Sequence, residues 1–349
     1  MDGPENREDD PGAELVLPCR DLERTLGAFV DELGFRLEMI FPADGPRVAR
    51  VARDGLRLRL EQREGDGLAL AELSLPASGR GPEHTPDGLA ITRRAPVAAP
   101  PCEPTLVVTR AGGGFATGRA GMGYRDLLPG RWGGRYIASH IRIADRGEVP
   151  DYVHHHAVRF QMIHCLAGRV RVVYEGQGEP FWLEAGDGVL QPPHIRHRVL
   201  ECSAGLEVIE LGLPAEHPTF VDHELTLPTA ERREVFGGQR FAHYRAAGAT
   251  WRPWDLPGLE ARDTGLREAT GGLAEVNVVR APSPTAPARW SPAGELLFLC
   301  VTRGELAFEH DGRHETLGRA DAVAFPPGST PELTARTEGT EFLEVRVIT

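Results

Sequence analysis

Two segments decide the fold of this chain: GEVPDYVHHHAVRFQMIHCLAG, which begins at Gly147, and GDGVLQPPHIRH, which ends at His197. His154 and His156 stand two residues apart in a predicted strand, so both imidazoles leave the same face of that strand. Gln161 begins an apolar run that ends at a glycine, which is typical of the next strand and its turn. His197 follows a Pro-Pro turn. Three imidazole nitrogens and one amide oxygen could therefore meet at one cation.

The order and spacing of these residues resemble the two motifs of the cupin superfamily, G-x(5-6)-H-x-H-x(3-4)-E-x6-G and G-x5-P-x(4)-H. The matching positions are Gly147, His154, His156, Gln161, Gly168, Gly186, Pro192 and His197. Gln161 stands where most cupins carry Glu. The resemblance implies a jelly-roll barrel, also called a double-stranded β-helix, and a metal site. Its expected ligands are His154, His156, Gln161 and His197.

The second half of the chain repeats this unit, because the segment around Gly168 recurs around Gly304. Both copies consist of short β-rich runs separated by Gly and Pro turns, as a jelly roll requires. We therefore expect a mainly β fold with two tandem cupin barrels, at residues 105–225 and 226–349. A metal is expected in the first barrel only, since the positions that match its four ligands hold other residues: Trp290, Pro292, Leu297 and Pro331.

Residues 13–75 are predicted to form a small α+β module that precedes the barrels. Apolar patterning predicts one βαβββ unit, with its strand, helix and three further strands at 14–19, 21–33, 36–41, 48–53 and 56–62. The segment LVLPCRDLERTL, which begins at Leu15, closes on ELGF at residues 32–35. This pattern resembles a module of the glyoxalase/bleomycin-resistance, or vicinal oxygen chelate, superfamily.

That second resemblance implies metal ligands on the first and last strands, at about the places of Glu14 and Glu61. A working site of that kind needs two modules, and the chain shows no convincing second one. We expect a structural or dimerising role for the module and a homodimeric protein; the alternative is a site that another subunit completes. Residues 1–12 are acidic and expected to be disordered, and residues 76–104 read as a linker rich in Pro, Gly and Ala.

Composition limits the class of protein. The chain has 349 residues and a formal charge of -12, which disfavours binding to nucleic acid or to an anionic membrane. Its five cysteines are scattered and show no C-x-x-C spacing, so neither a disulfide framework nor a thiolate zinc site is indicated. The sequence shows no signal peptide and no membrane-spanning run, and we expect a cytoplasmic protein.

The ligand types narrow the metal and the substrate. Three imidazoles and an amide oxygen suit Fe(II), and Zn, Ni, Mn or Cu as alternatives. All four ligands are neutral, so a bound cation would keep its full charge. Such a centre favours a small anionic substrate that chelates through two oxygens. With no ligand Glu present, neighbouring groups must move protons.

Candidate catalytic and substrate-binding residues follow from position along the predicted strands. Tyr152 and His140 are candidates for proton transfer, together with Tyr124, Tyr136 and Glu210. Arg159 is predicted to share the face of Gln161 and to bind a substrate carboxylate or act in catalysis. The further candidates for substrate binding are Arg171, Tyr174, Trp182 and Arg196.

Three functions fit these predictions. The first is an Fe(II) dioxygenase that uses O2, which the resemblance to bicupin gentisate and salicylate dioxygenases implies. The second is a Lewis-acid lyase, isomerase or cyclase of the uronate-sugar or polyketide type using Zn, Ni or Mn, which the Gln161 departure favours. The third is a cupin that binds a small molecule without catalysis. The fold by itself does not choose among them.

Overall fold

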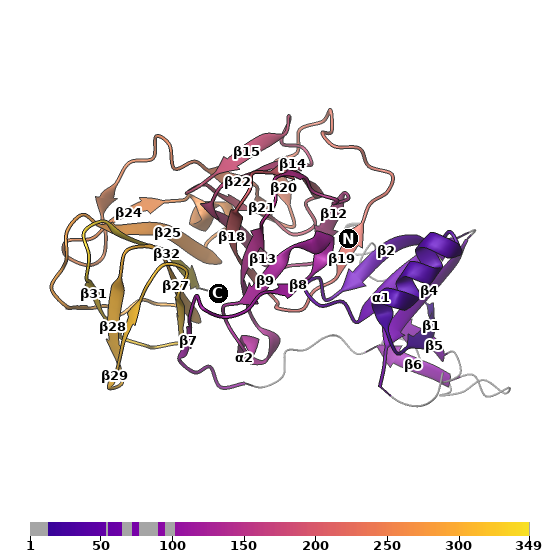
Figure 1. Cartoon of the computed structure of the whole chain (residues 1–349), viewed down its shortest axis with the longest axis horizontal. Helices are drawn as coiled ribbons and strands as arrows, with labels where there is room; N and C mark the ends of the chain where they lie inside the picture. Colours follow the sequence, from indigo (N-terminus) through magenta and orange to yellow (C-terminus); the bar gives the residue numbers. More distant parts are fainter. Residues whose placement is uncertain (1–12, 54, 65–71, 77–89, 95–101, 349) are drawn as a thin grey trace, which may run out of the picture. The chain divides into compact units, whose positions relative to one another are not determined.

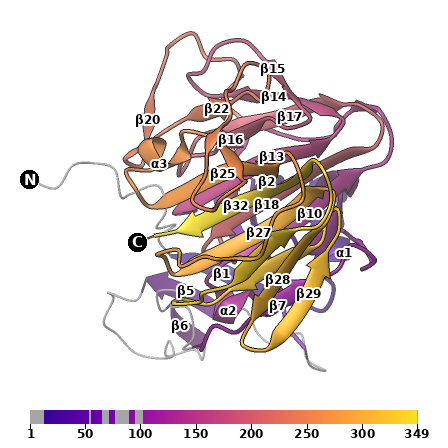
Figure 2. The same cartoon turned by 90° about the vertical axis from the view of Figure 1, so that its left-hand side faces the viewer.

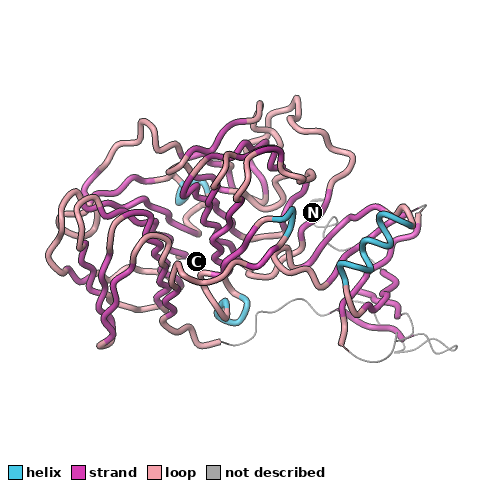
Figure 3. Tube along the Cα trace, in the orientation of Figure 1, coloured by secondary structure: helices cyan, strands magenta, loops and turns pink. Residues whose placement is uncertain are grey.

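The computed structural model describes residues 13–53, 55–64, 72–76, 90–94 and 102–348. The chain forms two compact units. The first comprises Met1–Ala99 together with Tyr152–Ala157 and Glu216–Leu225, and the second comprises Pro100–Asp151, Val158–Ala215 and Thr226–Thr349. Strands dominate the described residues, and the helices are short (Figure 3). The expected tail, residues 1–12, lies outside the described part.

The first unit contains the predicted βαβββ order. Its elements are β1 (Glu14–Cys19), α1 (Leu22–Gly27) continued by a π-helical turn (Ala28–Glu32), β2 (Arg36–Phe41), β3 (Val48–Arg53) and β4 (Leu56–Gln62). These bounds confirm the predicted elements. Asp21 caps the helix, since its side chain accepts from the backbone N–H of Arg24 at 3.0 Å. The apolar side of the helix packs on the sheet through Leu22 and Leu26.

Four more strands extend this sheet. They are β5 (Glu72–Pro76), β6 (Ala90–Arg94), β12 (His154–His156) and β19 (Thr219–Val221). Within the first unit the strand order is β12-β19-β2-β3-β4-β1-β5-β6. The pairs β1–β4 and β5–β6 are parallel, and the others are antiparallel. The sequence predicted a linker over residues 76–104, but β6 lies inside this segment, so the segment is not a linker throughout.

The second unit contains two barrels, each made of two sheets. In the first barrel one sheet has the order β22-β16-β13-β18-β10-β9-β8, and the other contains β15-β14-β17 with β11 paired to β17. The bounds are β8 (Ala116–Thr117), β9 (Gly123–Asp126), β10 (Ile137–Ile143), β11 (Gly147–Glu148), β13 (Phe160–Ala167), β14 (Arg169–Tyr174), β15 (Phe181–Glu184), β16 (Gly188–Leu190), β17 (His197–Cys202), β18 (Leu206–Leu213) and β22 (Ala242–Tyr244).

The second barrel repeats this plan. Its sheets have the orders β23-β24-β25-β32-β27-β30-β7 and β26-β31-β28-β29, and some of its strands face the viewer in Figure 2. The bounds are β7 (Val107–Thr109), β23 (Arg252–Pro253), β24 (Glu260–Asp263), β25 (Ala274–Ala281), β26 (Ala288–Arg289), β27 (Leu296–Arg303), β28 (Leu306–His310), β29 (Arg313–Leu317), β30 (Ala322–Phe325), β31 (Glu332–Ala335) and β32 (Thr340–Val347).

The remaining elements are short. They are the 3-10 turn Arg119–Gly121, the strands β20 (Val235–Phe236) and β21 (Gln239–Arg240), and the helical turns α2 (Arg131–Gly134) and α3 (Leu266–Ala269). None of the described helices has the length and apolar character that crossing a membrane requires.

Each barrel includes a strand that comes from outside its expected part of the chain, and the two barrels share a core. β7 pairs with β30 of the second barrel, although it precedes the first barrel in the chain. In Figure 1, β7 is drawn in purple beside strands of the second barrel. β22 pairs with β16 of the first barrel, although it follows the boundary expected after residue 225. Between the large sheets, side chains such as Met162 and Leu211 pack in one core with Phe298 and Val345. This packing buries one face of each sheet, as sheet-on-sheet contacts do.

Strand alternation sends every second side chain into a barrel. On β13, Phe160 and Met162 point into the core shared by the barrels, whereas Cys165 lies in the core inside the first barrel. On β32, Val345 points into the shared core and Phe342 into the interior of the second barrel. The odd-numbered residues of β13 and the even-numbered residues of β32 therefore face the two barrel interiors.

Candidate metal centre

β12 carries two of the candidate ligands. His154 and His156 are both buried, and both imidazoles are held through Nδ1. Nδ1 of His154 lies 2.8 Å from the carbonyl oxygen of Tyr152, and Nδ1 of His156 lies 2.8 Å from the hydroxyl of Thr219. Because a carbonyl oxygen only accepts, His154 carries its proton on Nδ1 and its lone pair on Nε2.

His197 begins β17 directly after the Pro-Pro turn. The turn is closed by a hydrogen bond from Ile195 N–H to the Pro192 carbonyl at 3.2 Å. Nδ1 of His197 lies 3.0 Å from the Ile195 carbonyl oxygen, so this ring also carries its proton on Nδ1. Burial lowers the pKa of His197 to about 4. At neutral pH the imidazole is therefore neutral, which is the form that binds a metal.

The three histidines meet. One ring nitrogen from each of His154, His156 and His197 lies within 4.8 Å of the other two. Among the described residues, no other group of three or more His, Cys, Asp or Glu side chains converges in this way. All three Nδ1 atoms are engaged in hydrogen bonds, which assigns Nε2 as the ligand atom of each ring. This donor set fits a divalent transition metal.

Gln161 lies inside the first barrel, on β13. Its side chain is buried, and its amide nitrogen donates to the carboxylate of Glu210 on the neighbouring strand β18. The other amide atom, Oε1, is buried and accepts no hydrogen bond from the described residues. A buried carbonyl oxygen without a donor is costly, so it favours an electropositive partner such as a cation or a substrate hydroxyl.

Tyr174 connects His197 to the aromatic rings of Phe181 and Phe241. Its ring stacks on the His197 imidazole with centroids 5.5 Å apart and on Phe181 at 5.9 Å. Its hydroxyl accepts from Nε2 of Gln191 at 2.9 Å, and burial raises its pKa well above the ordinary value. Phe241, from the segment between the barrels, packs against the same ring at 4.7 Å.

Three of these neighbours escaped the sequence analysis: Gln191, Thr219 and Phe241. Thr219 and Phe241 lie outside both motifs. Gln191 lies inside the second motif, directly before Pro192, and this position is the signal that could have identified it. Thr219 and Phe241 reach the site region through strand pairing and chain packing, which no local pattern reports.

The two candidates for proton transfer lie in different surroundings. Tyr152 holds His154 through its backbone carbonyl, and its ring meets the His154 ring edge to face at 5.8 Å. His140 alternates with the inward-facing Ile141 on β10. Its Nδ1 lies 2.9 Å from Arg125 and its Nε2 lies 3.2 Å from Glu207, and burial with the Arg125 charge lowers its pKa to about 4. The structure therefore brings His140 to an ion-pair cluster rather than to the three histidines.

The candidate substrate-binding residues other than Tyr174 lie toward the surface. Arg159 is exposed and precedes β13. The remaining three pair with neighbours: Arg171 with Glu201 at 2.9 Å, Trp182 with the Arg169 guanidinium at 4.6 Å, and Arg196 with Glu175 at 3.5 Å. These contacts do not gather the four residues around one ligand.

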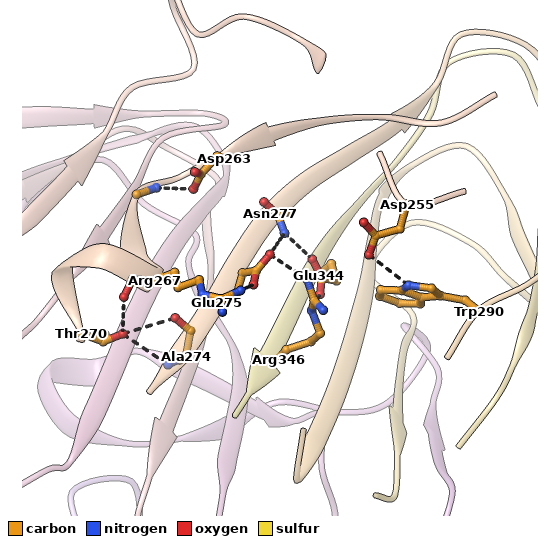
Figure 4. A network of polar contacts seen from close by, with 11 residues as sticks. Asp255, Asp263, Arg267, Thr270, Ala274, Glu275, Asn277, Trp290, Glu344 and Arg346 are labelled. Atoms are coloured by element: carbon orange, nitrogen blue, oxygen red, sulfur yellow. Dashed lines mark hydrogen bonds and ion pairs between the residues drawn. The ribbon is translucent and has the colours of Figure 1, made fainter. Parts of the chain in front are cut away.

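The second barrel carries a buried polar network (Figure 4). Asn277 Nδ2 donates to Glu344 Oε2 at 2.7 Å, and Arg346 Nε lies 2.6 Å from Glu344 Oε1. Arg346 also donates to Glu275 at 2.6 Å. Burial raises the pKa of Glu344 to about 7, although the Arg346 charge acts in the opposite direction. A guanidinium thus supplies positive charge inside this barrel.

The residues that match the candidate ligands in the second barrel carry apolar or indole side chains. Trp290, which matches His154 in the repeat, donates from its indole nitrogen to Asp255 at 3.1 Å (Figure 4). Its ring packs on Trp254 with centroids 4.5 Å apart. Leu297, which matches Gln161, lies in the same core. These side chains offer no imidazole or amide to a cation.

The carboxylates expected as ligands in the N-terminal module bind arginines. Glu14 is buried and forms an ion pair with Arg50, and Arg59 lies 3.8 Å from it. Glu61 pairs with Arg59 at 3.2 Å and with Arg63 at 3.4 Å. Both carboxylates therefore have guanidinium partners within their own unit.

Several solved structures are similar to this chain. A tryptophan-to-tyrosine variant of salicylate 1,2-dioxygenase from Pseudoaminobacter salicylatoxidans, in complex with gentisate, is 19% identical with a TM-score of 0.50, over 66% of this chain and 76% of that chain. A glycine-to-alanine variant of the same enzyme with gentisate is 17% identical with a TM-score of 0.50, over 71% and 83%. The protein Ylba from E. coli is 12% identical with a TM-score of 0.48, over 69% and 89%. Neither known protein families nor curated proteins give a match to this sequence.

The likeness to the dioxygenase structures shows the fold of this chain and does not show its activity. The chain has mainly β cupin barrels, which confirms the fold class that the sequence motifs predict. The resemblance of the N-terminal module to the glyoxalase superfamily stays a prediction, as do the homodimer and the cytoplasmic location.

Proposed function

We propose that this protein is a metal-dependent bicupin enzyme, an Fe(II) dioxygenase that acts on a small anionic organic substrate able to chelate. The observation that carries the proposal is the convergence of His154, His156 and His197 with all three Nδ1 atoms hydrogen-bonded. The gentisate held by the similar dioxygenase structures supports a hydroxylated aromatic acid as the first substrate class to test.

The charge of the site supports an anionic substrate. Three neutral imidazoles leave a divalent cation with its full charge, and the buried surroundings weaken the screening of that charge by water. Fe(II) bound there would supply open positions for a chelating anion and for O2. We assign Gln161 as the fourth protein donor through its buried Oε1, which the hydrogen bond from its amide nitrogen to Glu210 orients.

Tyr174 and Gln191 support this site from the side of His197. The Tyr174 ring fixes the plane of the His197 imidazole by stacking, and Gln191 fixes the Tyr174 hydroxyl. With Phe181 and Phe241, Tyr174 forms an aromatic wall. Such a wall excludes water and suits a planar substrate ring.

A second function has one observation in its favour. Glu210 is a carboxylate inside the first barrel that accepts from Gln161, so it could move a proton during a non-redox reaction. A Lewis-acid isomerase, lyase or cyclase with Zn, Ni or Mn would use such a base. This alternative predicts conversion of a hydroxy or keto acid without consumption of O2.

The test is metal analysis followed by oxygen uptake. Protein purified without added metal under anaerobic conditions should contain about one equivalent of iron, and it should consume O2 with a member of a panel of catechols, hydroxybenzoates and 1,3-dicarbonyl compounds. His156→Ala and His197→Ala should abolish metal binding. His314→Ala, which changes an exposed histidine of the second barrel, is the matched control and should retain it.

The outcomes separate the candidates. Zinc, nickel or manganese without oxygen uptake, but with conversion of a panel compound, would favour the isomerase, lyase or cyclase. A bound metal with no turnover of any panel compound would favour the third interpretation, a cupin that binds a small molecule. Absence of any bound metal would overturn the metal centre itself.

A further inference from the structure

The strand that carries His154 and His156 belongs to the sheet of the N-terminal module. β12 pairs with β19, and β19 pairs with β2 of the βαβββ unit. In this register, His156 lies opposite Thr219, and Thr219 lies opposite Ile40. The module therefore continues, strand by strand, the sheet on which two metal ligands stand.

Side chains of β19 contact the histidines directly. The Thr219 hydroxyl lies 2.8 Å from Nδ1 of His156, and Thr219 is fully buried. The next residue, Phe220, stacks on His155 with centroids 5.1 Å apart and an interplanar angle of 25°. Two adjacent residues of β19 thus hold two adjacent residues of β12.

The βαβββ unit in turn holds β19. The Arg50 guanidinium on β3 lies 6.0 Å from the centre of the Phe220 ring and is itself fixed by the buried Glu14 carboxylate. Ion pairs to the module also stand on either side of β19. Arg47 binds Glu216 at 2.8 Å before the strand, and Arg36 binds Glu224 at 2.8 Å after it.

We propose that the N-terminal module positions the metal centre through β19, and that Thr219 on this strand is the positioning residue. Thr219 acts by fixing the ring of His156 so that Nε2, and not Nδ1, is the ligand atom. The inference rests on the proposed metal centre and adds a role for residues that hold no metal themselves. It also accounts for Glu14, whose buried carboxylate supports Arg50.

The physical basis is the hydrogen bond that a metal-binding histidine makes through the ring nitrogen that does not bind the metal. A hydrogen bond to the second ring nitrogen fixes the tautomer and the ring orientation, and its loss typically lowers metal affinity by about 10- to 100-fold. Valine has nearly the shape of threonine but provides no acceptor for an Nδ1–H group. The buried Nδ1 of His156 would then lose its partner on β19, and the ring would lose its fixed orientation.

The experiment is Co(II) titration of the metal-free full chain under nitrogen, followed by the visible absorption bands of the bound ion. Thr219→Val should weaken the Co(II) Kd by about 10-fold or more and change the bands. Thr219→Ser, which keeps the hydroxyl, should restore both. The matched control is Thr340→Val in the second barrel, since Thr340 is also fully buried with a hydrogen-bonded hydroxyl. It should leave Co(II) affinity unchanged.

The possible failures can be told apart. If the wild type binds no Co(II), the proposed metal centre and the positioning role are both refuted. If the wild type and Thr219→Val bind Co(II) equally with the same bands, the positioning role is overturned and the centre stands. Should Thr219→Val not fold, Thr219→Ala provides the second test, because it also removes the hydroxyl that contacts Nδ1 of His156. It should also weaken the Kd, and an unchanged Kd would contradict the proposal.

Discussion

Glu344 of the second barrel occupies the sheet position that Glu210 occupies in the first. Glu210 lies opposite Ile163 on one side and Ser139 on the other. Glu344 lies opposite Leu299 and Asn277 in the same arrangement. Both carboxylates belong to the strand faces that point into their barrels, so the duplication has kept an inward carboxylate in each copy.

The partners of the two carboxylates differ. Glu210 accepts from Gln161, whereas Leu297 stands at the matching position of the second barrel. There, Glu344 binds Arg346, a residue whose counterpart in the first barrel is Gly212. The second barrel therefore balances its carboxylate with a guanidinium of its own chain, whereas the first barrel has a glycine at that position.

Glu344→Gln should change how stability depends on pH. The folded pKa of Glu344 is about 7 and its ordinary value is 4.5, so between these values the folded state holds a proton that the unfolded state has lost. Wild-type stability should thus fall as pH rises from about 4.5 to about 7, relative to the variant. Urea unfolding of both proteins across this range measures the difference. A stability difference between the two proteins that stays constant with pH would contradict the raised pKa of Glu344.

His140→Gln should have the opposite effect. The folded pKa of His140 is about 4 and its ordinary value is 6.5, so the unfolded chain takes up a proton that the folded protein does not. Wild-type stability should fall as pH drops from about 6.5 to about 4, and it should fall less steeply in the variant. Unfolding midpoints over this range check the prediction. If the stability of both proteins changes equally with pH, His140 has the same pKa in the folded and the unfolded state.

Gln161→Glu should retain the metal and weaken the binding of an anionic chelator. The new carboxylate would add negative charge beside Glu210, and it would repel a substrate anion. We expect Kd for a hydroxybenzoate to rise by about tenfold, which corresponds to about 1.4 kcal/mol. Anaerobic spectral titration of the metal-loaded protein measures it, with the uncharged Gln161→Met as control. Tighter binding by Gln161→Glu would refute the charge argument.

Tyr174→Phe should destabilise the protein by leaving the Gln191 amide without its acceptor. The amide is buried and donates to the Tyr174 hydroxyl at 2.9 Å, so the loss should be roughly 1–3 kcal/mol. The double change Tyr174→Phe with Gln191→Leu should recover much of it, because both polar partners are removed together. A double-mutant cycle from chemical unfolding measures the coupling. Simple additivity of the two single changes would argue against the hydrogen bond.

The sequence by itself predicted the elements of the N-terminal module and the residue types of the candidate metal centre. Alternation with a period of two placed His154 and His156 on one face, and the bounds of all four predicted N-terminal strands were found as expected. The repeat also located the residues, such as Trp290, that stand in place of histidines in the second barrel. These features are local, or repeat at a fixed spacing, so a linear pattern records them.

Only the tertiary structure decided which groups surround the candidate ligands. Thr219 is 63 residues from His156, and Glu210 is 49 residues from Gln161. Their contacts arise from strand pairings that close long loops, and a side chain carries no local sign of its partner on another strand. The placement of β12 beside β19 and β2 is of the same kind. Sequence periodicity fixes the face of a residue, whereas packing between distant strands fixes its neighbours.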